Sequence, residues 1–178
     1  PGPQGVPASM LIVAASRHPQ SCRQVELVKR SGIPVIAPPA AWFTDDAEDG
    51  AILAELCRAL ADGPAVLTTI GLPDMPGLGE ALVARLAWVV VMLLSGEVPT
   101  AVGPSSIVLT GGDAAIAVSR ALGARGLRLQ GEVLRGMPWG YLAGGIVDHL
   151  PVVTKAGGFG NEHALMRAIQ FLQGTDDD

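Results

Sequence analysis

Short apolar runs alternate with longer helix-like segments along almost the whole chain, and this alternation most constrains its fold. The run at residues 10–15 (MLIVAA) is continuously apolar, which is typical of a strand covered on both faces of its sheet. The next segment opens with Pro19, carries Val25 and Val28 at helical spacing, and ends at Gly32. Because strands and helices alternate, we expect an α/β fold, a layered α/β/α domain with a largely parallel sheet.

The same pattern continues to the end of the chain. We expect strands at residues 10–15, 33–38, 65–70, 106–110, 126–133 and 150–155, and helices at residues 18–32, 45–63, 80–95, 114–123 and 161–172. Hydrophobic residues make up 49% of the 178 residues, which suits the core of one domain. The domain is expected to cover residues 10–173, preceded by a Pro- and Gly-rich linker or tail at residues 1–9.

Charge and hydropathy argue against two classes of partner. The net charge is −5 and the basic residues form no patch, so we expect no nucleic-acid binding. The most apolar run, residues 86–94, is much shorter than the roughly 20 residues of a membrane span, so we expect a buried helix and no membrane contact. A partner could cover the part of this helix around Trp88, so a homo-oligomer is possible.

The two cysteines and the N-terminus bear on the compartment. Cys22 and Cys57 are far apart and form no CxxC pair, as expected of thiols in a reducing compartment. The first nine residues carry no basic region followed by an apolar stretch, so they do not resemble a secretory signal. We therefore expect a cytoplasmic protein.

Three loops rich in small residues each leave a strand end and enter a helix. They are residues 15–21 (ASRHPQS), 110–114 (TGGDA) and 155–161 (KAGGFGN). In parallel sheets, ligands bind outside the carboxyl ends of the strands, so these loops are expected to form one site.

The loop at residues 110–114 has features of a phosphate site. Gly111 and Gly112 allow a positive φ and a close approach of a ligand to the backbone. They precede a helix whose first N–H groups attract anions. Asp113 is a candidate acceptor for a ribose hydroxyl or a Mg²⁺-bound water. The alternative is a tight turn in which Asp113 only offsets the helix dipole.

The loop at residues 155–161 combines a cation with a bare backbone. Lys155 ends a strand, and Gly157, Gly158 and Gly160 follow it. An ammonium and several unshielded N–H groups could surround one anion. The alternative is a surface lysine before a flexible turn, with Phe159 packing the loop onto the core.

Other chemistries have weaker support in the sequence. The Walker pattern GxxxxGK[ST] is absent, and no GxGxxG follows the first strand. Ser16 or Ser21 could cap a helix or touch a phosphate, but a Ser–His nucleophile pair has no nucleophile-elbow context. The histidines lack metal-ligand spacing, so no protein metal site is expected. A lyase using Lys155 as a Schiff-base amine remains a rival, and it needs a depressed lysine pKa.

Three segments together carry a resemblance to a known family. Residues 9–32, 108–140 and 150–165, in this order and spacing, resemble the C-terminal nucleotide-binding domain of the four-carbon acid sugar kinase family. The resemblance runs from about Met10 to Leu172. It implies an ATP-dependent kinase of threonate, erythronate or 3-oxo-tetronate type sugar acids, with a separate N-terminal substrate domain.

The resemblance also implies roles for the loop residues. The nucleotide phosphates would be held by Gly111, Gly112, Asp113 and Ala114. Ser16 would reach the nucleotide too, and Gly157 would line the same pocket beside Lys155, Gly158 and Gly160. The family usually has threonine where this chain has Ala114, and often glycine where it has Ala15, and either change could weaken ATP binding.

The implied cofactors are ATP and Mg²⁺, and the catalytic residues are unknown. The family's N-terminal half, with its acidic substrate-binding motifs, is not in this sequence. Phosphoryl transfer depends on holding the acceptor in line with the γ-phosphate, so this chain alone is expected to bind ATP–Mg²⁺ and turn over little. The alternative is a catalytically silent module that binds a nucleotide or a phosphorylated metabolite.

Overall fold

A computed structural model describes residues 9–43, 49–74, 76–98 and 103–175 of the chain. Its strands are β1 (Met10–Ala14), β2 (Val35–Ile36), β3 (Pro64–Thr68), β4 (Ser106–Thr110), β5 (Gly126–Leu134), β6 (Met137–Ala143) and β7 (Pro151–Lys155). Its helices are α1 (Pro19–Arg30), the 3₁₀ helix η1 (Ala40–Phe43), α2 (Asp49–Asp62), α3 (Gly79–Leu94), α4 (Gly112–Ala121) and α5 (Ala164–Gln173). The expected linker at residues 1–9 lies, except for Ser9, outside the described residues.

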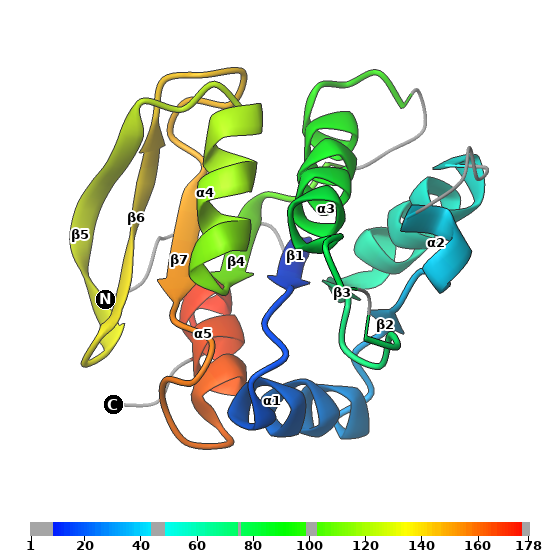
Figure 1. Ribbon diagram of the computed structural model, residues 1–178. Coiled ribbons are helices and arrows are strands. Elements are labelled where there is room, and N and C mark those ends of the chain that lie inside the picture. The colour runs from blue at the N-terminus through cyan, green and yellow to red at the C-terminus, as the bar shows by residue number, and fades with distance from the viewer. Residues whose placement is uncertain (1–8, 44–48, 75, 99–102, 176–178) are drawn as a thin grey trace.

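All seven described strands form one mixed sheet in the order β2-β3-β1-β4-β7-β6-β5 (Figure 1). The first five in this order pair in parallel, and β6 and β5 pair antiparallel. β1 is central, with β3 on one side and β4 on the other. The expected α/β domain with a largely parallel sheet is therefore confirmed.

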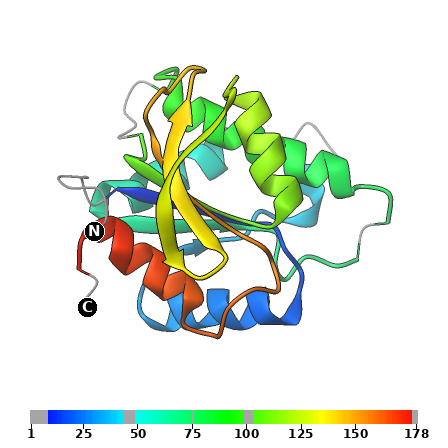
Figure 2. The ribbon, with the colours of Figure 1, turned by 90° about the vertical axis from the view of Figure 1, so that its left-hand side faces the viewer.

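Helices cover both faces of the sheet. Figure 2 shows α1 and α5 below the sheet, with α3 and α4 above it. Along β1, Leu11 and Val13 pack in the core cluster of α2, α3 and α4, whereas Met10 and Ile12 pack in the cluster of α1 and α5. Successive side chains of a strand point to opposite faces, so a strand buried on both faces must be apolar throughout.

The hairpin of β5 and β6 is the main departure from the sequence expectation. One strand was expected at residues 126–133, but the chain reverses around Gly136 and β6 runs back along β5. β6 was missed because it contains Pro138 and Gly140, which are poor strand formers. Gly140 is needed there, since a Cβ would lie 2.2 Å from the carbonyl oxygen of Arg128.

Several expected boundaries also shift. β2 is shorter than expected, because Pro34 and Pro38 on either side have no N–H to donate to a ladder. α5 begins at Ala164 and not at Asn161, because Asn161 starts a turn in which its Oδ1 accepts the His163 N–H at 3.1 Å. The expected start of the second helix, residues 45–48, lies outside the described residues.

The apolar run at residues 86–94 forms the second half of α3, as expected. Leu86, Val90 and Leu93 are each at most 2% exposed and pack in the core, while Trp88 is half-buried. The described residues include no helix long and apolar enough to cross a membrane.

Candidate nucleotide site

The carboxyl ends of four strands lie side by side at one edge of the sheet, the lower edge in Figure 1. The register aligns Ala14 of β1 with Thr68 of β3 and Thr110 of β4, and Thr110 with Lys155 of β7. The three predicted loops therefore begin next to one another.

Ser16 is the point where the three loops meet. A Cβ built on Gly157 would lie 1.9 Å from the Ser16 Oγ, so the backbone of the third loop passes directly against this hydroxyl. A Cβ built on Gly111 would lie 3.5 Å from the Ser16 Cβ, which is ordinary contact. The structure thus brings together Ser16, Gly111 and Gly157, which are far apart in the sequence.

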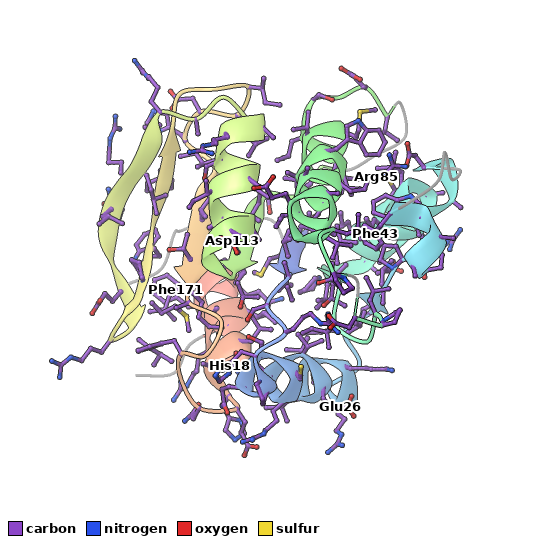
Figure 3. All side chains as sticks on the ribbon, in the orientation of Figure 1. His18, Glu26, Phe43, Arg85, Asp113 and Phe171 are labelled. Carbon is purple, nitrogen blue, oxygen red and sulfur yellow. The ribbon has the colours of Figure 1, made fainter. Side chains whose placement is uncertain are left out.

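The Gly-Gly-acid turn forms the start of α4. Gly111 is the N-cap residue, with φ 103° and ψ 129°, and no side chain caps the helix. The first N–H groups of a helix have no intrahelical acceptor, so those of α4 are open to a ligand. Asp113 in the first turn is exposed, and Figure 3 labels it on α4. Ala114 is 1% exposed with its side chain in the core, so only its backbone can face a ligand.

Lys155 is placed differently from a surface lysine. It is 3% exposed, and its ammonium donates to the carbonyl oxygens of Ala156 at 2.8 Å, Gly157 at 2.9 Å and Phe159 at 3.3 Å. The charge therefore lies inside the loop and contacts its backbone. Phe159 packs against the turn at Gly136, where an added Cβ would lie 2.7 Å from the ring, and it remains 37% exposed.

α1 holds the same loop from the other side. The Ser21 Oγ donates to the Gly157 carbonyl at 2.6 Å, and the Gln24 Nε2 donates to the carbonyls of Phe159 at 3.0 Å and Asn161 at 2.7 Å. Gln24 was not among the predicted site residues. Gln24 lies four residues before Val28 and so shares the apolar face of α1. A polar residue on an apolar helix face is the sequence signal that could have found it.

The cap of α1 is His18, at the lower edge in Figure 3, and neither Ser16 nor Ser21. Its Nδ1 accepts the Gln20 N–H at 3.1 Å, and the Ser16 Oγ accepts the His18 backbone N–H at 3.3 Å. The imidazole and the Ser16 hydroxyl are therefore not hydrogen-bonded to each other as a nucleophile and its base would be.

Burial lowers the pKa of Lys155 from 10.5 to about 8. A lysine amine that forms a Schiff base needs such a shift. Lys155, however, is almost fully buried and its ammonium donates to three carbonyls, an arrangement that does not present the nitrogen to a carbonyl substrate.

The lowered pKa of Lys155 predicts a pH-dependent stability. Between about pH 8 and pH 10.5 the unfolded chain binds more protons at this residue than the folded chain, so the free energy of unfolding rises with pH. The cost of burying the charge is fully present below pH 8 and gone above pH 10.5. In denaturant unfolding, the free energy of unfolding of the wild type should rise more over this interval than that of Lys155→Met. Parallel pH profiles of the two proteins would contradict it.

The end of β3 and the loop after it contact the first predicted loop at this edge of the sheet. The Thr68 Oγ1 donates to the Ala14 carbonyl at 2.6 Å, and the Arg17 guanidinium donates to Asp74 at 2.9 Å and to the Leu72 carbonyl at 3.1 Å. These contacts fix the backbone on both sides of Ser16. Surface ion pairs contribute little to stability. The main effect of the Arg17–Asp74 pair is therefore to position the loop after β3.

A hollow lies next to the third loop, with Asn161 at the end of that loop in its wall. It has a volume of about 620 Å³ and lies between α1 and α5, with Leu27, Ser31, Met166 and Gln170 in its wall. None of the predicted site residues lines it. We place the candidate site at the loop junction, because the backbone N–H groups of a helix N-terminus and of glycine turns are sufficient to bind phosphate.

Comparison with known families supports a nucleotide domain. A family model described as a nucleotide-binding C-terminal domain matches residues 11–165. The D-threonate kinase of Bordetella bronchiseptica is 38% identical over 167 residues, covering 92% of this chain and 40% of that kinase. The D-erythronate kinase of Heliobacterium modesticaldum is 33% identical over 94 residues, covering 53% of this chain and 19% of that kinase.

Solved structures share the fold. A Bordetella bronchiseptica domain of unknown function, crystallised with bound citrate as a domain-swapped dimer, superimposes with a TM-score of 0.79 at 35% identity. The match covers 95% of this chain and 40% of that one. A Haemophilus influenzae protein has a TM-score of 0.76 at 17% identity and covers 94% of this chain and 41% of its own, which shows the fold alone.

The extent of these matches settles the family. The family model covers most of the chain, and the chain spans about 40% of the length of the Bordetella kinase. The chain therefore belongs to the four-carbon acid sugar kinase family, as its C-terminal nucleotide-binding domain.

Proposed function

We propose that the junction of the three loops binds the phosphates of ATP. The observation that carries this proposal is the contact of Gly157 and Gly111 with Ser16, which places two glycine turns and a hydroxyl around one point. The residues suit a phosphate, since they offer the open N–H groups of α4, the backbone of the glycine loop and the Ser16 hydroxyl.

The remaining predicted residues surround this point. Gly112, Asp113 and Ala114 would bind through the start of α4, and Gly158 and Gly160 through the loop after β7. Mg²⁺ would arrive with the nucleotide, and the exposed Asp113 carboxylate could accept a hydrogen bond from a metal-bound water or a ribose hydroxyl.

The proposed reaction is phosphorylation of a four-carbon sugar acid of the threonate, erythronate or 3-oxo-tetronate type. Support comes from the matches to D-threonate and D-erythronate kinases. Bound ATP would supply the transferable phosphoryl group. The acceptor would be held by an N-terminal substrate domain outside this sequence, so the chain alone would be nearly inactive.

Two further points belong to this proposal. A cytoplasmic location suits the free thiols of Cys22 and Cys57. A homo-oligomer is suggested by the domain-swapped dimer of the Bordetella structure. Size-exclusion chromatography with light scattering, on the complete protein, would show whether it forms.

The test is calorimetric titration of the chain with ATP and ADP, with and without Mg²⁺. We expect dissociation constants between about 1 µM and 1 mM. Absence of heat and of any thermal shift at millimolar nucleotide would contradict the proposal. Binding without phosphoryl transfer, even after a substrate domain is supplied, would favour the silent binding module.

A further inference from the structure

We propose that Lys155 is a positioning residue, which turns the peptide N–H groups of Gly157, Gly158 and Gly160 outward to bind a phosphate. The inference rests on the proposed function and assigns Lys155 a different role from a phosphate ligand. Lys155 acts through the carbonyls of the loop.

The hydrogen bonds of the ammonium are fully used inside the loop. A lysine ammonium has three N–H donors, and here they contact the carbonyls of Ala156, Gly157 and Phe159 at 2.8, 2.9 and 3.3 Å. The side chain is almost fully buried. Direct contact with a phosphate would require Lys155 to give up one of these carbonyls and to reach the surface.

The positions of the three carbonyls determine where the glycine N–H groups point. In a trans peptide the C=O and the next residue's N–H point in opposite directions. The residues that follow the three bound carbonyls are Gly157, Gly158 and Gly160. Each carbonyl drawn inward by Lys155 therefore turns one glycine N–H outward.

These outward N–H groups have no partner of their own. Among the described residues, none accepts a hydrogen bond from the N–H of Gly157, Gly158 or Gly160, whereas the N–H of Phe159 is bound by the Ala156 carbonyl at 3.1 Å. Backbone N–H groups in a turn that have no protein partner are available to donate to an anion. Glycine leaves them uncovered by side chains.

α1 acts as a second clamp on the same carbonyls. Ser21 donates to the Gly157 carbonyl and Gln24 to the Phe159 carbonyl, and both side chains are 1% exposed. Two of the three carbonyls bound by Lys155 thus have a second donor from α1. A substitution in α1 should therefore reproduce part of the effect of losing Lys155.

The experiment compares loop order without nucleotide and ATP affinity in the same proteins. Lys155→Met removes the contacts of the ammonium, and Gln24→Met removes one of the two donors from α1. Lys29→Met, at the other lysine of the chain, which is exposed, is the control. NMR relaxation gives the order parameters of the amides of Gly157, Gly158 and Gly160, and calorimetry gives the ATP dissociation constant.

We expect Lys155→Met to lower these order parameters from roughly 0.85 to below about 0.6. We expect it to weaken ATP binding about tenfold or more, because the loop must then be ordered on binding. Gln24→Met should change both quantities in the same direction by less, and Lys29→Met should change neither. If Lys155→Met does not fold, Gln24→Met and Ser21→Ala decide the question.

Two results would overturn the inference alone. Weaker ATP binding with an equally ordered loop would make Lys155 a direct phosphate ligand. A disordered loop with unchanged ATP binding would show that the loop does not contribute to ATP binding. Absence of ATP binding by the wild type would instead overturn the proposed function together with the inference.

Discussion

Gly157→Ala is expected to weaken ATP binding by about ten- to a hundredfold, the cost of forcing extra atoms into a packed site. The added methyl would lie 1.9 Å from the Ser16 Oγ and 2.6 Å from the Ser16 Cβ, so one of the two loops must move. Ser16 cannot turn away easily, because its Oγ accepts the His18 N–H and its Cβ is fixed to the backbone. Calorimetric titration with ATP–Mg²⁺ measures the change.

Two matched substitutions control for the effect of a methyl group. At Gly158 the nearest neighbour of an added Cβ is the ring of His18, an exposed side chain that can move, so Gly158→Ala should weaken binding less than Gly157→Ala. Gly50→Ala lies in α2, where an added Cβ has no neighbour within 4 Å, and it should bind ATP like the wild type. Equal affinities for Gly157→Ala and Gly50→Ala would show that the phosphates bind elsewhere.

Gly111→Ala is expected to reduce both stability and ATP affinity. Gly111 has φ 103°, which side-chain-bearing residues rarely adopt, so alanine would strain the backbone by about 1–3 kcal/mol. The strain is conformational, since the nearest contact of the added Cβ would be an ordinary 3.5 Å. If the turn relaxes, the N–H groups at the start of α4 move, and ATP binding should fall about tenfold. Urea unfolding and calorimetry give the two values.

Substitution of the neighbouring Gly112 tests the effect of an added methyl group on ligand binding without backbone strain. Gly112 has an ordinary φ and open space around an added Cβ, so Gly112→Ala should leave the free energy of unfolding nearly unchanged. Weaker ATP binding in this variant at full stability would indicate that the phosphate closely approaches the backbone here. If Gly111→Ala were as stable as Gly112→Ala, the turn would not require a positive φ.

Much of the fold could be predicted from local pattern. The apolar run of β1, the proline start and glycine stop of α1, and the apolar face of α3 are each encoded within about a dozen residues. β6 could not be predicted in this way, because Pro138 and Gly140 hide its strand character. It forms because β5 and β7 lie on either side of it and supply backbone pairing partners, which the residue types within β6 do not reveal.

The candidate site was predicted in part. The glycine turns and their places after strands β4 and β7 were visible in the sequence, and so was Ser16 after β1. The buried contacts of Gln24 were not, since its partners in the loop lie more than 130 residues away. The binding roles of all these residues stay predictions until nucleotide titrations are made.

The sequence by itself determined the α/β class, the order of most elements and the small residues at the carboxyl ends of the strands. Hydrophobic periodicity and backbone freedom are local properties, and each residue carries them wherever the chain goes. Only the tertiary structure decided that Gly157 lies against Ser16 and that the Lys155 ammonium faces inward to three carbonyls. These features depend on sheet register and on the packing of α1 against the loop, which join segments that no local pattern connects.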